Sequence, residues 1–304
     1  MEGSDFRWWD ELIPDALGLI FSNLSLQEVL TVVPRVCKSW GKAVTGPYCW
    51  QEIDIEEWSN RSERDNIHRM LRMLITRSSQ SLRKLCVSGL QDDLIFSFIA
   101  ENAHSLQTLK LPRSTISNSI VEQVAGKLSA ITFLDVSYCG KIGAGALEAI
   151  GKHCKSLAGL RRNMHPLDLE GKLSQNDEGH AIATTMPKLK HLEMAYLLID
   201  TTSALEIIYN CPELEFLDLR GCWDVKLDDK LLKEKLHKLK VLGPHVVDHY
   251  ERHEWEDCSD YSDSLFDYES LDGMWDDDER LGGLELRFYG GFDEDSSYGW
   301  PPSP

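Results

Sequence analysis

A short pattern of leucines recurs along the middle of the chain and constrains its fold more than any other feature. Most copies read Leu-x-x-Leu-x-apolar, and they begin at Leu82, Leu106, Ile131, Leu157, Leu189, Leu214 and Leu239. Successive starts are 24, 25, 26, 32, 25 and 25 residues apart. A unit of this size cannot bury its own apolar face, so a period in this range predicts repeats that stack on one another.

Each copy is expected to form one strand and then one helix. In the Leu-x-Leu part, alternate residues point to the same side, as they do in a strand. Between the strands, helices are expected at Leu94–Ala103, Ile120–Leu128, Leu147–His153, Leu205–Tyr209 and Leu231–Leu236. The sequence therefore predicts an α/β fold in which residues 81–244 form a curved solenoid of about six or seven leucine-rich repeats.

Cysteines recur at fixed places in this pattern. Cys139 and Cys154 follow the third strand segment, and Cys211 and Cys222 take the same places around a later copy. These residues resemble the cysteine-containing subtype of leucine-rich repeat. In a reducing compartment such cysteines are expected to be free thiols that pack as small apolar groups.

The N-terminal stretch predicts three short helices. Pro14 suits the first turn of a helix, because its missing N–H has no partner there. Ser25 and Glu28 form a capping box that begins a second helix. Pro34 interrupts that helix and begins a third, on which Val36 and Val44 are expected to share a face. Three short helices leave much apolar surface exposed, which is typical of a docking module.

This stretch resembles the F-box, a helical motif that binds Skp1-type adaptors, and cysteine-containing repeats commonly follow an F-box. The departures from the motif are Ile13 and Cys49, which are apolar replacements, and Ala16, which replaces an acidic residue. The resemblance implies that the adaptor contacts Ile13, Pro14, Leu17, Ile20, Phe21, Leu24, Val36, Cys37, Lys38 and Trp40. The alternative is that the helices only cap the repeats.

The predicted organisation is an F-box at 8–55, a linker and capping helix at 56–80, repeats at 81–244 and an acidic tail at 245–304. The net charge is −18, of which −15 falls on the tail. So high a charge density opposes compaction, and the tail is expected to be mostly disordered. The acidic balance argues against nucleic-acid binding. Alternating apolar residues in Leu281–Phe292 are the exception, and they suggest one added strand or strand addition by a partner.

The fourth repeat is irregular. Arg162 stands where an inward apolar residue is expected, and the longest step follows it. The segment 161–188 is interpreted either as a surface insertion with a local shift of register or as a loop that helps to hold a target.

The sequence shows no pattern of catalytic residues and no cofactor motif. Nothing marks Cys37, Cys139 or Cys222 as a thioester-forming nucleophile. His245, His249 and His253 have helical spacing but match no known metal site, so we expect no metal. Without an apolar run near eighteen residues or a secretory leader, the chain is expected in the cytoplasm or nucleus and not in a membrane.

The side of the strands opposite to the inward leucines is the expected target surface, with Phe133 and Phe216 as aromatic anchors. The residues expected to contact a target are Lys110, Phe133, Asp135, Arg161, His191, Glu193, Phe216 and Asp218. For any single one, a solvated strand position is the alternative.

The two resemblances together imply a non-enzymatic substrate receptor of a Skp1–cullin–F-box ubiquitin ligase. Such a receptor binds the adaptor, and through it a cullin, and directs a protein target to ubiquitin-dependent proteasomal degradation. The alternative from another class is a scaffold or inhibitor that binds its partners without ubiquitin transfer.

Overall fold

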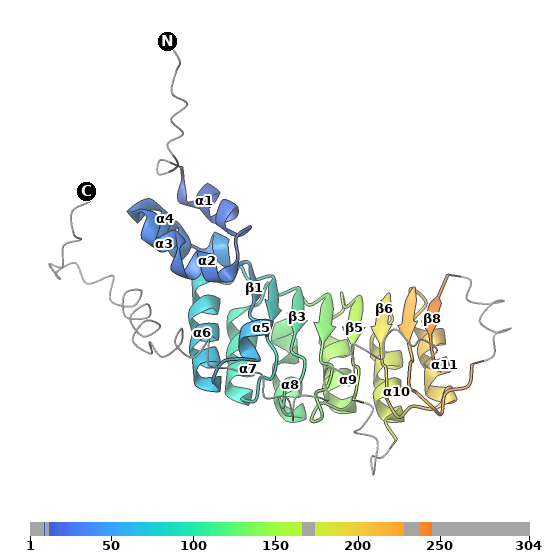
Figure 1. Cartoon of the computed structure of the whole chain (residues 1–304). Helices are drawn as coiled ribbons and strands as arrows, with labels where there is room; N and C mark the ends of the chain where they lie inside the picture. Colours follow the sequence, from blue (N-terminus) through green and yellow to red (C-terminus); the bar gives the residue numbers. More distant parts are fainter. Residues whose placement is uncertain (1–8, 10–11, 166–173, 228–237, 245–304) are drawn as a thin grey trace, which may run out of the picture. The chain divides into compact units, whose positions relative to one another are not determined.

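The structure is a computed structural model that describes residues 9, 12–165, 174–227 and 238–244 (Figure 1). The chain divides into two units, Met1–Val247 and Asp248–Pro304, and every described residue belongs to the first. The predicted helix Leu231–Leu236, the acidic tail with its three histidines, and the possible strand in Leu281–Phe292 lie outside the described residues.

The N-terminal module consists of short helices whose starts follow the sequence signals. Pro14 opens the first, as predicted. The capping box of the second is confirmed: the Glu28 N–H donates to Ser25 Oγ (3.3 Å), and the Ser25 N–H donates to Glu28 Oε2 (3.0 Å). The bounds are α1 Pro14–Phe21, α2 Leu26–Thr31, α3 Val33–Val36, α4 Lys38–Thr45 and the 3-10 helix η2 Pro47–Trp50.

The prediction of one continuous third helix is wrong. Cys37 is fully extended, with φ −158° and ψ 169°, so it ends α3 and precedes α4. The change of direction separates the two valines that were expected to share a face: Val36 is exposed and Val44 is buried. The stretch from Val33 to Thr45 therefore forms two short α-helices, α3 and α4.

Eight parallel strands form one sheet in sequential order, β1 to β8. The repeat leucines stand opposite one another, from Leu85 with Leu109 in the second and third strands to Leu217 with Val241 at the end. The strands are β1 Glu52–Asp54, β2 Lys84–Cys86, β3 Thr108–Lys110, β4 Phe133–Asp135, β5 Gly159–Arg161, β6 His191–Glu193, β7 Phe216–Asp218 and β8 Lys240–Leu242. The first strand was not predicted. It lies before the repeats, yet pairs with β2.

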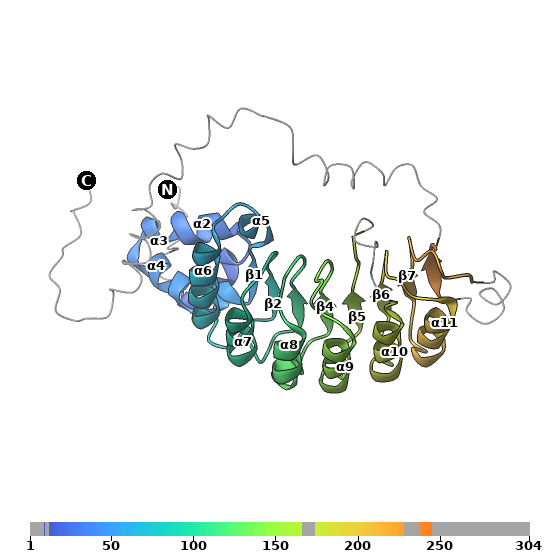
Figure 2. The ribbon, with the colours of Figure 1, turned by 90° about the horizontal axis from the view of Figure 1, so that it is seen from below.

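Helices form a second layer along one side of the strands, as Figure 2 shows for α7 to α11. Side-chain oxygens of Asp92, Ser117 and Asp200 cap α7, α8 and α11. The helices after the module are α5 Glu56–Ser59, α6 Arg64–Arg77, α7 Asp93–Asn102, α8 Asn118–Val124, the 3-10 helix η3 Ala125–Leu128, α9 Ala144–His153, α10 Asn176–Thr185 and α11 Thr201–Asn210. The stretch predicted as a polar linker thus contains α5. No described helix has the length and apolar character needed to span a bilayer.

The core lies between the two layers, and buried cysteines tie the third, fifth and sixth repeats each to the repeat before it. The Cys139 thiol donates to the Leu111 carbonyl (3.1 Å), and Cys222 donates to Met194 (3.2 Å). The thiol of Cys154, which follows a helix, donates to the Leu128 carbonyl (3.1 Å). A thiol is small enough for a tightly packed interior and can still donate a weak hydrogen bond to a buried carbonyl.

The fourth repeat keeps its register, so the predicted local shift is wrong. Leu160 stands opposite Leu192, in line with the other repeats. Arg162 points inward and is 1% exposed, and its charge is met by the carboxylate of Glu178 in α10, with Nε to Oε2 at 2.9 Å. A buried charge is tolerated only when it is paired in this way. Residues 166–173, where the extra length lies, are outside the described residues.

Candidate protein-interaction sites

The first helix sorts the predicted adaptor contacts into two groups. Ile13, Ile20 and Leu24 are exposed, by 66%, 42% and 41%. Leu17 and Phe21 are buried, at 0% and 2% exposure, and belong to the core of the module. The expectation that these two side chains contact an adaptor is therefore wrong. They fold the helix against its neighbours, which leaves the other three residues on the surface.

The second predicted block is also mixed. Val36 and Lys38 are exposed, whereas Cys37 and Trp40 are half-buried. The Trp40 ring packs against Phe21 with centroids 4.9 Å apart, so part of its role is internal. Pro14 is exposed at the start of α1.

Four exposed apolar residues of the module were not predicted: Trp9, Leu12, Leu19 and Val32. Leu19 stands where an amphipathic helix would carry a polar residue, and that was the available signal. Of the departures from the motif, Cys49 is buried, with its sulfur 3.7 Å from the Gly18 carbonyl oxygen, and is therefore not itself a surface residue. The module therefore folds around its own core and still presents several large apolar side chains to solvent, as a docking surface does.

A second surface lies on the open face of the sheet, where side chains alternate with the buried leucines. Phe133, His191 and Phe216 are half-buried there. His191 stacks flat on Phe216, with ring centroids 4.5 Å apart and planes inclined by 5°. Cations lie over both phenyl rings: Arg161 Cζ is 5.6 Å from the centroid of Phe133, and Lys240 Nζ is 5.9 Å from that of Phe216. Phe133 and Phe216, the two residues predicted to anchor a target, thus lie in aromatic and cationic stacks within the chain.

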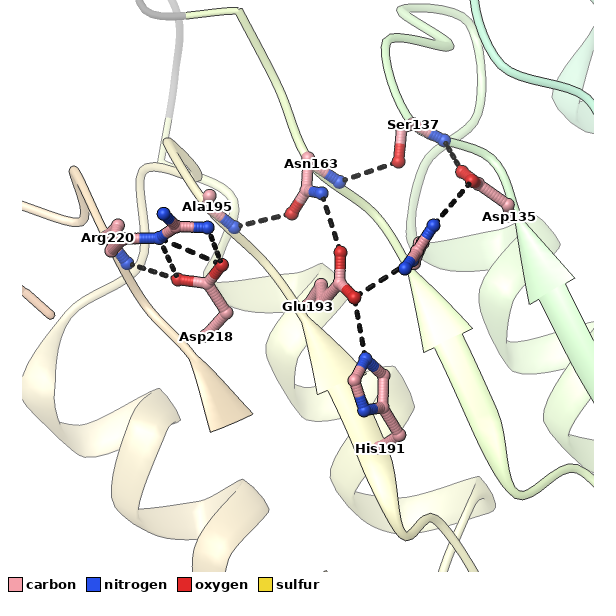
Figure 3. Close-up of polar contacts among 9 residues, drawn as sticks. Asp135, Ser137, Asn163, His191, Glu193, Ala195, Asp218 and Arg220 are labelled. Atoms are coloured by element: carbon pink, nitrogen blue, oxygen red, sulfur yellow. Dashed lines mark hydrogen bonds and ion pairs between the residues drawn. The ribbon is translucent and has the colours of Figure 1, made fainter. Parts of the chain in front are cut away.

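Glu193 is the centre of a polar cluster between these stacks (Figure 3). Its Oε1 accepts from Arg161 Nε (2.9 Å) and lies 2.6 Å from His191 Nε2, and its Oε2 accepts from Asn163 Nδ2 (3.2 Å). Asn163 in turn accepts from the Ala195 N–H through Oδ1 (2.9 Å). The cluster joins strands β5 and β6 across the open face and fixes the orientation of Arg161 and His191.

The environment of Glu193 favours its charged form. Burial raises the pKa of this carboxyl, but the hydrogen bond from His191, the charge and hydrogen bond of Arg161 and the hydrogen bond from Asn163 together outweigh burial and hold its pKa below the ordinary value. Glu193 is therefore ionised at neutral pH, and it anchors the two groups beside it.

Two predicted contact residues are buried and already engaged within the chain. Asp218 accepts from Arg220 through the backbone N–H (3.0 Å), Nε (3.0 Å) and Nη2 (2.7 Å). Asp135 accepts from the Ser137 N–H (3.0 Å). The expectation that their carboxylates face a target is wrong, because the chain uses them as acceptors that hold its own donors. Of the predicted residues, the half-buried Lys110, Phe133, Arg161, His191, Glu193 and Phe216 reach the surface.

The described residues hold no group of three or more His, Cys, Asp or Glu arranged to bind a metal. Burial raises the pKa of the Cys139 thiol to about 11 and that of Cys222 to about 12. Both thiols are protonated at neutral pH, and nucleophilic attack requires the thiolate.

Comparison with known proteins confirms the resemblance drawn from the N-terminal stretch. Residues 9–52 match the F-box domain. The chain is 58% identical to the Arabidopsis thaliana F-box protein FBW2 over 315 residues, which cover 100% of this chain and 99% of the relative. It is 30% identical to the F-box protein SKIP19 of the same plant, with 93% and 91% covered. It is 28% identical to the Arabidopsis putative F-box/LRR-repeat protein 9, with 77% and 95% covered.

Identity at this level over the full length of a relative extends beyond the F-box into the repeats. The chain belongs to the F-box family of plant proteins, in the group that carries leucine-rich repeats.

Proposed function

We propose that this protein is the substrate-recognition subunit of a Skp1–cullin–F-box ubiquitin ligase. F-box proteins generally serve as substrate receptors of such ligases. The observation that carries the proposal is the exposed apolar set on the module, chiefly Ile13, Ile20, Leu24 and Val36, around a core that is complete without them. Side chains of this kind that the fold does not need are expected to be covered by a partner, here a Skp1-type adaptor that links the chain to a cullin.

The mechanism in this proposal is proximity. We interpret the repeat sheet as a curved leucine-rich solenoid, supported by the sequential parallel strands and their constant register. Its open face holds the target while the F-box holds the ligase core, so lysines of the target meet a charged ubiquitin-conjugating enzyme at high effective concentration. The target is then directed to proteasomal degradation. The described cysteines are unpaired, which supports a reducing location in cytoplasm or nucleus.

The adaptor contact is tested with the double variant Ile20→Asp and Leu24→Asp. Both side chains are exposed, so the fold should be retained, while two carboxylates in an apolar interface should abolish co-purification with a Skp1 protein. Leu94→Asp is the matched control, because Leu94 is 71% exposed and lies in the repeats. A double variant that still co-purifies with the adaptor at the wild-type level would contradict the proposed contact.

Ubiquitin transfer is tested separately. The wild-type chain is combined with adaptor, cullin and a charged conjugating enzyme, with proteins captured from cells in which the proteasome is blocked. Ubiquitylation of a captured protein is expected, and Phe133→Ala or Phe216→Ala should reduce its capture while sparing the adaptor. Adaptor binding with no ubiquitin transfer to any captured protein would favour the scaffold or inhibitor.

A further inference from the structure

The third residue after most repeat strands has a left-handed backbone. The φ values are +67° at Gly89, +57° at Arg113, +61° at Tyr138, +61° at Tyr196 and +72° at Gly221. These residues occupy one position of the repeat, at the carboxyl ends of β2, β3, β4, β6 and β7. We call them the left-handed row.

The repeat requires this conformation whatever the side chain. Each N–H of the row donates to a carbonyl of the following repeat at 2.7–2.9 Å, as Tyr138 does to Asn163 and Tyr196 to Arg220. The chain has to turn away from the strand directly after this bond. Glycine adopts the left-handed turn without a steric penalty, and the row uses glycine at two positions. Arginine and tyrosine carry a penalty there, because their Cβ approaches the next carbonyl.

The side chains of the row lie along it. Arg113 Cζ is 5.8 Å from the ring centroid of Tyr138, and the Tyr138 ring meets His165 edge-on, with centroids 6.5 Å apart. A Cβ added to Gly221 would collide with the ring of Tyr196, so that ring lies on the next repeat. Arginine and tyrosine at positions where glycine would avoid the backbone strain indicate that their side chains have a use.

The only charged side chain of the row is the exposed Arg113. The equivalent place after β1 holds Glu57, which pairs with Arg61. The row and the residues immediately before it (Ser88, Pro112, Ser137, Asn163, Ala195 and Arg220) contain no carboxylate. The carboxylates of β4, β6 and β7, which are Asp135, Glu193 and Asp218, accept hydrogen bonds from the chain itself. Those of β1, Glu52 and Asp54, are exposed. From β3 to β7 the described edge therefore carries one exposed arginine, Arg113, and two half-buried tyrosine rings, while Arg220 is paired with Asp218.

We propose that the left-handed row is a docking surface for an acidic peptide segment with aromatic residues, carried by the target protein. The proposal rests on the proposed receptor function and adds the chemistry of the target. Arginine pairs with carboxylates and stacks on aromatic rings, and tyrosine contributes apolar area with little loss of side-chain entropy. A peptide is favoured over nucleic acid because nucleic acid carries a negative charge at every phosphate, so a chain of net charge −18 repels it more strongly than a peptide segment of which only some residues are acidic.

The test uses the full chain with its Skp1-type adaptor and a fluorescent random copolymer of glutamate and tyrosine. Fluorescence anisotropy should show saturable binding that weakens with added salt. The variant Arg113→Gly with Tyr138→Gly removes both side chains and relieves both left-handed penalties. We expect its affinity to fall at least tenfold while its melting temperature stays near or above that of the wild type.

Two further variants make the outcome specific. Gln80→Gly is the matched control, because Gln80 is exposed and left-handed (φ +67°) in the turn after α6, so it relieves a similar penalty outside the row. Arg113→Gln keeps the backbone strain and removes the charge, and it should weaken binding even if the glycine variant fails to fold. Unchanged affinity in the row variants would overturn the proposal. Binding of a lysine–tyrosine copolymer or of polyuridine RNA with the same affinity would also overturn it. Failure of the wild-type chain to bind the Skp1-type adaptor would count only against the proposed receptor function.

Discussion

Removing the carboxylate of Glu178 is expected to destabilise the repeats far more than removing a surface charge. Arg162 is 1% exposed, and the Glu178 side chain is 9% exposed. The Arg162 guanidinium donates to Glu178 through Nε (2.9 Å) and Nη2 (3.3 Å), and Nη2 also donates to the Ile142 carbonyl (2.8 Å). Glu178→Ala leaves the guanidinium buried with neutral acceptors only.

The expected cost follows from the burial. Breaking a buried ion pair by removing one partner costs about 3–5 kcal/mol, because an uncompensated charge remains inside. Replacing both partners with apolar residues of suitable volume should cost less than about 1 kcal/mol or even stabilise. The chain supplies the template: the equivalent positions of the second repeat hold Leu111 and Ile120. The double variant Arg162→Leu and Glu178→Ile should therefore be close to the wild type in stability.

Urea unfolding monitored by circular dichroism gives the free energy of unfolding for both single variants and for the double variant. Arg61→Ala is the control, because the Arg61–Glu57 pair is solvent-exposed and such pairs contribute about 0–1 kcal/mol. A loss below about 1 kcal/mol for Glu178→Ala would refute the reasoning, since water would then have to reach Arg162. A double variant as unstable as Glu178→Ala would show that the pair stabilises the fold in its own right.

Three further predictions concern the sites. Leu17→Asp should unfold the N-terminal module, at a cost of about 4 kcal/mol or more, whereas Ile20→Asp should leave its circular dichroism spectrum unchanged. Glu193→Gln should reduce stability most above pH 4.5, the ordinary pKa of a glutamate, and progressively less as the pH falls. The folded-state pKa of Glu193 lies below that value, so the stabilisation by the carboxylate is present above it and is lost as the carboxylate becomes protonated. The midpoints of urea unfolding, measured across this pH range, test the prediction. Of the described cysteines, Cys37 is half-buried and the others are buried, so Cys37 should react first with a thiol reagent in the native protein. Mass spectrometry of the labelled protein identifies the cysteine that reacts first.

The repeat strands were predictable because their signal is local and redundant. Leu85, Leu109 and Leu134 each show the alternation of a strand, and the constant spacing predicts that they stand opposite one another, as they do. The capping box of α2 was predictable for the same reason, since Ser25 and Glu28 satisfy each other within one turn.

The rest depended on partners far away in the sequence. Arg162 looked like a break in the pattern, because its partner Glu178 lies on the following helix, 16 residues later. Asp218 looked like a surface charge, because alternation predicts the side of a strand on which a residue lies and not what covers it there. The left-handed row, by contrast, does have a signal in the sequence: Gly89 and Gly221 mark a repeat position that favours glycine, and Tyr138 and Tyr196 occupy it in other repeats.

The unpredicted β1 bears on how a receptor of this kind would work. Trp50, which closes the F-box module, is fully buried, and its indole N–H donates to the Val44 carbonyl of α4 (2.8 Å). The Cζ atom of Arg77 in α6 lies 5.9 Å from the centroid of the Trp50 ring. Two residues after Trp50 the chain enters β1, which pairs with the first repeat strand, β2. The module and the repeats thus share one hydrophobic core. A packed core holds two binding surfaces in a defined relation more effectively than a polar linker does, and proximity catalysis depends on that relation.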